Sequence, residues 1–241
     1  MRLGIISDVH GNLVALRRVL AHLATQSVDL VVNLGDCVSA PLWPSETFDE
    51  LQRLGATTVR GNHDRVLGDP KWIEESKIVA FTWAALSDVE RETLSSLPMT
   101  RLIDGDIFAV HGTPESDGKY LLEDSIDGRL CFATSATLGE RLAGTTGSLV
   151  LCGHSHLQHT AWAPGRRLVI NPGSVGCPRY AGNPDPLINE AGSAHARYAI
   201  ATRRGGSWSA ELFVLDYDWT PVVERARSVG REDWATAFMK V

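Results

Sequence analysis

Five short polar clusters hold the residues of this 241-residue sequence that could do metal chemistry together. Each cluster contains carboxylate, imidazole or amide side chains. In chain order the clusters are Asp8-Val9-His10-Gly11-Asn12, Gly35-Asp36, Gly61-Asn62-His63-Asp64, His111-Gly112 and Gly153-His154-Ser155-His156. Two divalent ions held about 3.5–4 Å apart need a bridging anionic ligand with oxygen and nitrogen donors on either side. The clusters supply such a set, so we interpret them as a candidate dinuclear metal site.

The spacing within the clusters indicates which side chains could share an ion. Asp8 and His10 are separated by one residue, so both can lean toward one ion where a strand turns into its loop. Asp36 is a lone carboxylate next to Gly35, which lets the backbone approach closely, and it suits a bridging role. Carboxylate, amide and imidazole donors without thiolate favour Mn, Fe, Zn, Ni or Co over Ca or Mg.

The elements that must position these clusters are predicted strands. Buried-strand patterns at residues 3–7, 29–34 and 57–60 each end in a polar cluster, and helices are predicted from Asn12 and over residues 45–54. Asp8, Asp36 and Asn62 follow one another at intervals of 28 and 26 residues, close to the length of one strand-helix-strand unit. We therefore expect three parallel strands whose carboxyl ends meet at one crevice.

The second half of the chain indicates hairpins. We predict hairpins over residues 100–110, 162–171 and 198–215, a strand at 149–152 that leads into Gly153, and an irregular surface loop at 178–194. Residues 72–97 and 133–142 indicate helices, and the last twenty or so residues indicate helical or extended structure. The sequence contains no linker-like stretch that would divide it, so we expect one domain over residues 1–241. Residues 65–100 and 114–147 are expected to be covering or capping segments of that domain.

Composition narrows the class of protein. The formal net charge of −6 argues against a basic footprint for nucleic acid, so no stable nucleic-acid partner is expected. The four cysteines form no C-x-x-C pair, which indicates reduced thiols and a cytoplasmic location. No signal-peptide pattern and no apolar run of about 18 residues is seen, so no membrane contact is expected.

In order and residue type, the clusters resemble the pattern of the calcineurin-like metallophosphoesterases, namely D-x-H, G-D, G-N-H-D, H and G-H-x-H. The resemblance covers about residues 1–176 and is closest to the small bacterial and archaeal branch, which includes phosphodiesterases and begins S-D-x-H-G-N. It implies an α/β fold, specifically a four-layer α/β/β/α sandwich, and two divalent transition-metal ions as cofactors.

The resemblance also implies a role for each cluster. Carried over position by position, it implies that Asp8, His10 and His156 bind the first ion. The second ion is then bound by Asn62, His111 and His154, and Asp36 bridges the two ions. His63 is then the non-ligand histidine that stabilises the transferring phosphoryl group or protonates the leaving oxygen, and Asp64 orients its ring. The implied mechanism is in-line attack on phosphorus by a metal-bridging hydroxide.

Four further residues are candidates for substrate contacts, namely Asn12, Tyr120, Arg129 and Ser174. The function we predict is metal-dependent hydrolysis of a small phosphorylated substrate, which could be a phosphomonoester, a phosphodiester or a dinucleoside polyphosphate.

Two alternatives stay open, a metal-free scaffold or binding module on the same fold and a protein phosphatase. A scaffold would have no chemical reason to keep His63 beside complete ligands. Protein phosphatases use arginines next to the ligand clusters, and here Arg65 alone adjoins one. The sequence leaves open the substrate, the native metals and whether the chain forms a homo-oligomer.

Overall fold

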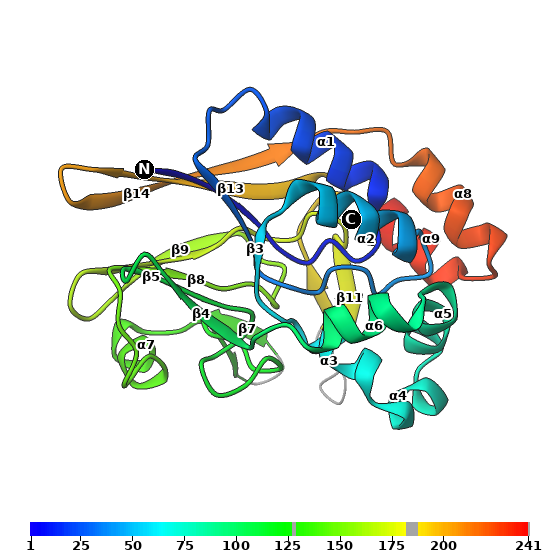
Figure 1. Ribbon diagram of the computed structural model, residues 1–241, viewed down its shortest axis with the longest axis horizontal. Helices are drawn as coiled ribbons and strands as arrows, with labels where there is room; N and C mark the ends of the chain where they lie inside the picture. The colour runs from blue at the N-terminus through cyan, green and yellow to red at the C-terminus, as the bar shows by residue number, and fades with distance from the viewer. Residues whose placement is uncertain (127–128, 182–187, 241) are drawn as a thin grey trace.

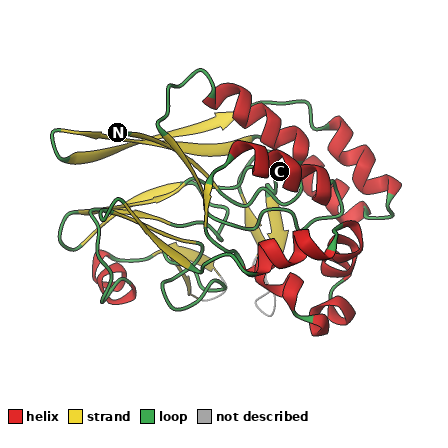
Figure 2. Cartoon of the chain, viewed as in Figure 1, coloured by secondary structure: helices red, strands yellow, loops and turns green. Residues whose placement is uncertain are grey.

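The computed structural model describes residues 1–126, 129–181 and 188–240, and its framework is two five-stranded sheets packed face to face. Helices cover the outer faces of both sheets, so the layers run helix, sheet, sheet, helix (Figure 1, Figure 2). The predicted four-layer α/β/β/α sandwich is confirmed.

The first sheet is built around the N-terminal strand, and its order is β14-β13-β1-β2-β3. The bounds of its strands are β1 Arg2–Ile6, β2 Leu30–Asn33, β3 Thr57–Thr58, β13 Ala196–Arg204 and β14 Ser207–Leu215. β1, β2 and β3 run parallel, as predicted. The predicted hairpin near the C-terminus forms β13 and β14, and β13 pairs antiparallel with β1.

Two helices connect the parallel strands, α1 (Leu13–Leu23) and α2 (Pro44–Leu54), both as predicted. The Asn12 side chain caps α1 by accepting a hydrogen bond from the Ala15 backbone N–H at 3.0 Å. α1 buries one apolar face against the first sheet, where Leu16 is fully buried. The first sheet is therefore covered on its outer face by the same helices that link its strands.

Two helices, α8 (Thr220–Ser228) and α9 (Glu232–Met239), follow β14, so helix is the outcome for residues 220–228 and 232–239 of the predicted helical or extended segment. α8 and α9 pack on Ala40 and Leu42 in the loop before α2 and form a separate apolar cluster there. In Figure 1 they lie beside α1 and α2, at the end of the molecule where the parallel strands finish.

The segment after β3 is helical. Its elements are α3 Asn62–Arg65, the 3-10 turn η1 Val66–Gly68, α4 Pro70–Glu75, α5 Lys77–Ala85 and α6 Asp88–Ser95. Ser87 caps α6 through its side chain. Val66, Val79 and Leu94 are buried in the same apolar cluster as α1, which fixes this segment on the helical layer.

The second sheet has the order β4-β5-β8-β10-β9 and contains the two predicted hairpins. The bounds of its strands are β4 Thr100–Ile103, β5 Ile107–Val110, β8 Leu149–Leu151, β9 His159–Ala163 and β10 Arg167–Asn171. β5, β8 and β10 are parallel. The outer face is covered by α7 (Ser135–Arg141) and by a segment that carries the hairpin of β6 (Glu123–Ile126) and β7 (Arg129–Phe132).

An apolar core fills the space between the sheets. Leu3 and Ile5 of β1 and Ile107 of β5 are buried in it, whereas Ile6 faces the helical layer. This alternation follows from the two-residue period of a strand, and it buries β1 on both faces.

One sequence expectation is corrected by the fold. Residues 178–194 were expected to be an irregular surface loop, but β11 (Arg179–Ala181) and β12 (Ile188–Glu190) pair antiparallel within them. Residues 182–187 of that expectation lie outside the described residues.

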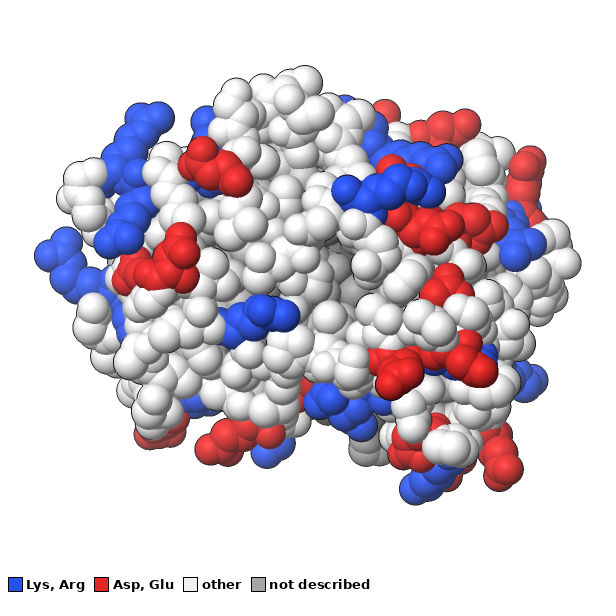
Figure 3. Space-filling view, in the orientation of Figure 1, with Lys and Arg blue, Asp and Glu red and all other residues white. Residues whose placement is uncertain are grey.

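The described surface carries mixed charge. On the face shown in Figure 3, basic and acidic side chains are interspersed among neutral ones, in keeping with the modest net charge. No helix within residues 1–126, 129–181 and 188–240 offers an apolar stretch long enough to cross a bilayer.

Candidate metal centre

All five polar clusters meet at the end of the sandwich where the parallel strands of both sheets finish. A cavity of about 130 Å³ lies there, and His63 and five of the predicted ligands line it, namely His10, Asp36, Asn62, His154 and His156. The remaining two predicted ligands, Asp8 and His111, are fully buried behind them. The fold therefore brings together all seven side chains that the sequence singled out as ligands.

The first group of donors gathers around Asp8, His10 and Asp36, whose ligand atoms lie within 4.8 Å of one another. The Asp8 Oδ1 atom is 3.2 Å from His156 Nε2, and the two Nε2 atoms of His10 and His156 are also 3.2 Å apart. Four donors thus point at one small volume, and they are the predicted first-ion set with the predicted bridge.

The second group is formed by Asp36, His111 and His154, again within 4.8 Å of one another. The Asn62 side-chain oxygen lies 3.2 Å from His111 Nε2. The Asp36 Oδ2 atom is 3.4 Å from His111 Nε2 and 3.7 Å from His10 Nε2, so it faces both groups. This position is what a bridging carboxylate requires.

Three of the imidazoles are held by the backbone in the orientation that a metal ligand needs. The Nδ1–H groups of His10, His111 and His156 donate to the carbonyls of Ser39, Leu34 and Cys177 at 2.9, 2.7 and 2.8 Å. Because a carbonyl can only accept, each Nδ1 carries the proton and each Nε2 can offer its lone pair to an ion.

The charges of the site favour a cation. Burial lowers the pKa of His10 and of His154 to about 4, which keeps both rings neutral at neutral pH. Burial also lowers the pKa of His111, but the Asp36 and Asp8 carboxylates outweigh it and raise that pKa to about 9. The negative charge that retains this proton would also attract a metal ion, and binding would release the proton.

Backbone strain is concentrated in the same loops. Of the eight non-glycine residues with positive φ in the described part of the chain, five are predicted ligands, namely Asp8, His10, Asp36, His154 and His156. Such conformations are disfavoured for residues with a Cβ and persist where the surrounding structure enforces them. The loops are therefore held in shapes that aim these side chains inward.

One buried atom tests whether the residues fit an ion. The Asp8 Oδ1 atom is buried and accepts no hydrogen bond from the described residues. A buried carboxylate oxygen without a donor is unfavourable unless a cation satisfies it. The donor set, the ring orientations and this atom together fit divalent metal.

Asp64 does not orient His63, so that prediction is wrong. Both Asp64 oxygens accept hydrogen bonds from the backbone, from the N–H groups of Asp36 at 2.8 Å, Cys37 at 2.9 Å and Gly61 at 2.9 Å. The His63 Nδ1 atom is buried with no hydrogen-bond partner among the described residues. Asp64 instead ties the loop of Asp36 to the loop of Asn62.

His63 lines the cavity beside the predicted ligands. Its ring packs edge-on against His10 with centroids 5.1 Å apart. Its backbone N–H donates to Asp36 Oδ1 at 2.8 Å, which fixes its position relative to the carboxylate shared by both groups.

Two of the four predicted substrate contacts are structural instead. Asn12 is fully buried, and its side chain caps α1 and donates to the Gly176 carbonyl at 3.0 Å. The buried Ser174 hydroxyl donates to the Asp8 carbonyl at 2.7 Å and accepts from the Cys177 N–H at 2.8 Å. Both side chains therefore hold the ligand loops together and do not face the cavity.

Tyr120 and Arg129, the other two candidates, remain predicted substrate contacts. Tyr120 lies at the edge of the site, with its ring centroid 5.1 Å from that of His154 and its hydroxyl bonded to the Tyr180 hydroxyl at 3.0 Å. The backbone of Arg129 begins β7, and its side chain lies outside the described part of the structure.

The cavity is also lined by residues that sequence reasoning missed, namely Ser39, Ile78, Cys177, Tyr180 and Trp234. The Cys177 sulfur lies within 4.8 Å of donor nitrogens of His10 and His156. No pattern marked Cys177, because it lacks a second cysteine at metal-ligand spacing. Trp234 comes from α9, whose sequence gave no sign of reaching the site.

Comparison with known proteins places these observations in a family. The calcineurin-like phosphoesterase superfamily domain matches residues 1–191. An uncharacterised protein of Methanocaldococcus jannaschii is 26% identical over 201 residues, which cover 73% of this chain and 77% of that protein. The crystal structure of a metallophosphoesterase from Sphaerobacter thermophilus is 26% identical, covers 99% of both chains and superposes with a TM-score of 0.74.

A third similarity concerns the fold alone. The crystal structure of a candidate diadenosine tetraphosphatase is 20% identical, covers 88% of this chain and 93% of that chain, and superposes with a TM-score of 0.52.

Proposed function

The chain belongs to the calcineurin-like phosphoesterase superfamily and is a metal-dependent phosphoesterase, and from this premise we propose that it hydrolyses a small phosphate ester or anhydride at two divalent ions. The observation that supports two ions is the position of Asp36. Its Oδ2 atom lies 3.7 Å from His10 Nε2 and 3.4 Å from His111 Nε2, and these histidines belong to different donor groups.

We assign the first ion to Asp8, His10, Asp36 and His156, and the second to Asp36, Asn62, His111 and His154. Ions bound there would act as Lewis acids, activating water and neutralising charge on the phosphoryl oxygens. The protein fixes these positions through the buried hydrogen bonds from the Nδ1 atoms of the histidines to backbone carbonyls.

His63 supplies the protein's own contribution to the reaction. Its ring borders the cavity, and its backbone bond to Asp36 sets its distance from both donor groups. From that place the imidazole would donate a hydrogen bond to a phosphoryl oxygen or a proton to the leaving oxygen. The Asp64 carboxylate acts indirectly, because its hydrogen bonds to backbone N–H groups hold the Asp36 loop against the Asn62 loop.

The size of the cavity suits a phosphoryl group and not a whole substrate. At about 130 Å³ it is smaller than the several hundred Å³ of a pocket that encloses a whole ligand. The phosphoryl group would occupy the enclosed part, while the leaving group would extend outward past Ile78, Tyr180 and Trp234. These apolar and aromatic side chains make an organic leaving group the better match.

A panel of substrates tests the proposal. The metal-free protein would be reloaded with Mn²⁺, Co²⁺ or Zn²⁺ and assayed on p-nitrophenyl phosphate, bis(p-nitrophenyl) phosphate and diadenosine tetraphosphate. We expect hydrolysis of at least one of them, rising until two ions are bound per chain. If the protein binds two ions but hydrolyses none of these substrates, the proposed hydrolytic activity is contradicted and a binding module is favoured.

The role of His63 can be separated from metal binding. His63→Ala should lower turnover by about 100-fold or more, the usual contribution of a positioned acid, while two ions stay bound. His159→Ala, in β9 and away from the cavity, is the matched control and should leave turnover unchanged. Loss of metal in His63→Ala would show that His63 is a ligand.

A further inference from the structure

We infer that the thiolate of Cys177 is an additional ligand of the first ion and makes that site selective for Zn²⁺, Co²⁺ or Fe²⁺ over Mn²⁺. The inference rests on the proposed metal centre. Its immediate basis is a third donor group in which His10, His156 and Cys177 offer ligand atoms within 4.8 Å of one another, and all three residues are buried.

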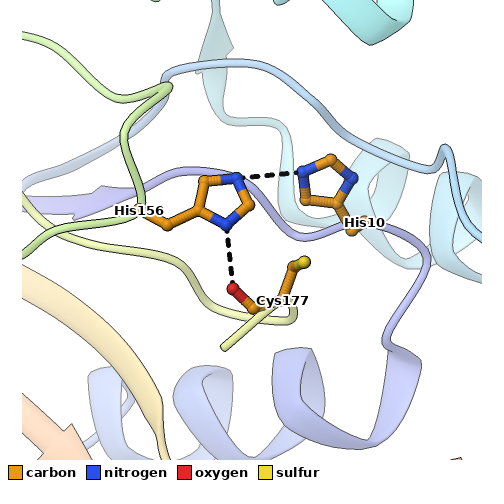
Figure 4. A group of neighbouring side chains, drawn as sticks. All are labelled: His10, His156 and Cys177. Atoms are coloured by element: carbon orange, nitrogen blue, oxygen red, sulfur yellow. Dashed lines mark hydrogen bonds between the residues drawn. The ribbon is translucent and has the colours of Figure 1, made fainter. Parts of the chain in front are cut away.

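The geometry of the three residues suits a shared ion. Figure 4 shows the imidazoles of His10 and His156 facing each other, with Cys177 below the two rings and its carbonyl joined to His156 by a hydrogen bond. The two Nε2 atoms are 3.2 Å apart. Zinc bonds of about 2.0–2.1 Å to nitrogen and about 2.3 Å to sulfur hold the donors of one ion roughly 3–4 Å apart, so the donors of this group, which lie within 4.8 Å of one another, would move closer together on binding.

The backbone of Cys177 is fixed relative to the ion site. Its carbonyl accepts from His156 Nδ1 at 2.8 Å, so the histidine that offers Nε2 to the ion also holds the cysteine. Its N–H donates to the Ser174 hydroxyl, which in turn donates to the Asp8 carbonyl. Two ligand loops and the cysteine are therefore joined by one chain of hydrogen bonds.

The residue before the cysteine locks this arrangement. A Cβ added to Gly176 would lie 1.9 Å from the Val9 carbonyl oxygen and 2.6 Å from the Asn12 Cβ, so only glycine allows the two loops to touch. The Gly176 N–H donates to the Asp8 carbonyl at 3.1 Å. This contact determines that the next side chain, Cys177, emerges beside His10 and His156.

Neighbouring atoms leave the thiol available for a metal. The Cys177 sulfur is in no disulfide, and it donates a hydrogen bond of 3.5 Å to the Arg179 carbonyl that metal binding would replace. Asp8, which shares the first site with His10 and His156, has a buried Oδ1 atom that accepts no hydrogen bond from the described residues. A cation in the first site would satisfy that oxygen. As the metal–sulfur bond forms, the S–H proton passes to solvent and no electron is transferred.

A thiolate would make the two ion sites chemically different. The second donor group offers only oxygen and nitrogen atoms from Asp36, Asn62, His111 and His154. Sulfur is a soft ligand that prefers Zn²⁺, Fe²⁺ and Co²⁺, whereas Mn²⁺ prefers oxygen donors. We therefore expect a mixed-metal centre when Zn²⁺ and Mn²⁺ are both supplied, with Zn²⁺ in the first site.

Cobalt spectroscopy on the full chain tests the inference. Co²⁺-loaded wild-type protein should show a near-ultraviolet charge-transfer band from thiolate to cobalt. The band should vanish in Cys177→Ser and persist in Cys131→Ser and Cys152→Ser, which remove an exposed thiol and a buried thiol outside the cavity. A band that survives Cys177→Ser would overturn the inference.

Two further results distinguish this inference from the proposed function. If wild-type protein binds two Co²⁺ ions without the band, Cys177 is not a ligand but the metal centre stands. If it binds no Co²⁺, both fail. In competition dialysis, Cys177→Ser should shift the ratio of bound Zn²⁺ to Mn²⁺ toward Mn²⁺ by about tenfold or more, and an unchanged ratio would contradict the inference.

A measurement without any variant guards against misfolding of Cys177→Ser. X-ray absorption by the zinc-loaded wild-type protein should contain a zinc–sulfur path at about 2.3 Å. Oxygen and nitrogen paths alone would overturn the assignment.

Discussion

Gly61 offers the sharpest test of how the metal centre is positioned. Its backbone, with φ −87° and ψ 171°, is extended and open to any residue, so conformation does not explain the glycine. The reason is steric. A Cβ at this position would lie 2.1 Å from Asp36 Oδ1 and 2.4 Å from the Asp36 backbone nitrogen. Cβ atoms essentially never approach other heavy atoms within 3.0 Å, so Gly61→Ala must displace Asp36 by roughly 1 Å.

The size of the effect follows from the place of Asp36 in both donor groups. Overpacking of this kind typically destabilises a protein by about 1–3 kcal/mol. A disturbed ligand environment weakens metal binding by about 10–100-fold, and a 1 Å misplacement lowers turnover by about 100-fold. We expect Gly61→Ala to lower the affinity for both ions, measured by calorimetric titration of the metal-free protein. The substitution should also lower the free energy of unfolding in urea.

Gly118 provides the matched control. A Cβ there meets no atom within 4 Å, and its φ is not in the positive region. Gly118→Ala should leave metal affinity unchanged and stability unchanged or slightly raised. The steric account would be refuted if Gly61→Ala bound two ions as tightly as wild type and unfolded at the same urea concentration.

Two further predictions concern buried carboxyl groups. Asp64→Ala removes the acceptor of three buried backbone N–H groups. It should lower the free energy of unfolding of the metal-free protein, measured in urea, by about 2–5 kcal/mol. A loss below about 1 kcal/mol would contradict the role of Asp64 in holding the two loops together. Burial raises the pKa of Glu123 from 4.5 to about 7. The protonated carboxyl group therefore contributes its full stabilisation below pH 4.5, and this stabilisation is lost as the pH rises through 7. Glu123→Gln should therefore gain stability over wild type between pH 5 and pH 8, by up to about 3 kcal/mol, and a difference that does not change with pH would refute this.

Much of the candidate metal centre could be predicted from the sequence, because the residue patterns that indicate it are local. Asp8, Asp36 and Asn62 each follow a short apolar strand, and parallel strands joined by helices must end at the same edge of a sheet. His111 and His154 follow strands of the second sheet in the same way. Residue type and position after a strand therefore marked the clusters, and the family resemblance implied which seven of their residues are ligands.

The direction of individual side chains could not be predicted in this way. Asp64 follows His63 directly, yet its carboxylate turns toward the backbone of the Asp36 loop. Asn12 and Ser174 adjoin the ligand loops, yet both point into the protein. Where a loop side chain points depends on local φ and ψ and on which buried donors need an acceptor, and these are properties of the packed loops.

The sequence by itself indicated three adjacent parallel strands with polar clusters at their ends, because hydrophobic periodicity and strand-end placement act over short stretches of chain, and the family resemblance implied the four-layer fold and the ligand roles. Only the tertiary structure showed which distant residues line the same cavity. Cys177 lies 21 residues beyond His156 and Trp234 lies in the last helix, and neither carries a local signal. Cys177 reaches the site because Gly176 packs against the Asp8 loop, and Trp234 because α9 packs beside the loop before α2. Such long-range contacts exist only once the sheets and helices have come together.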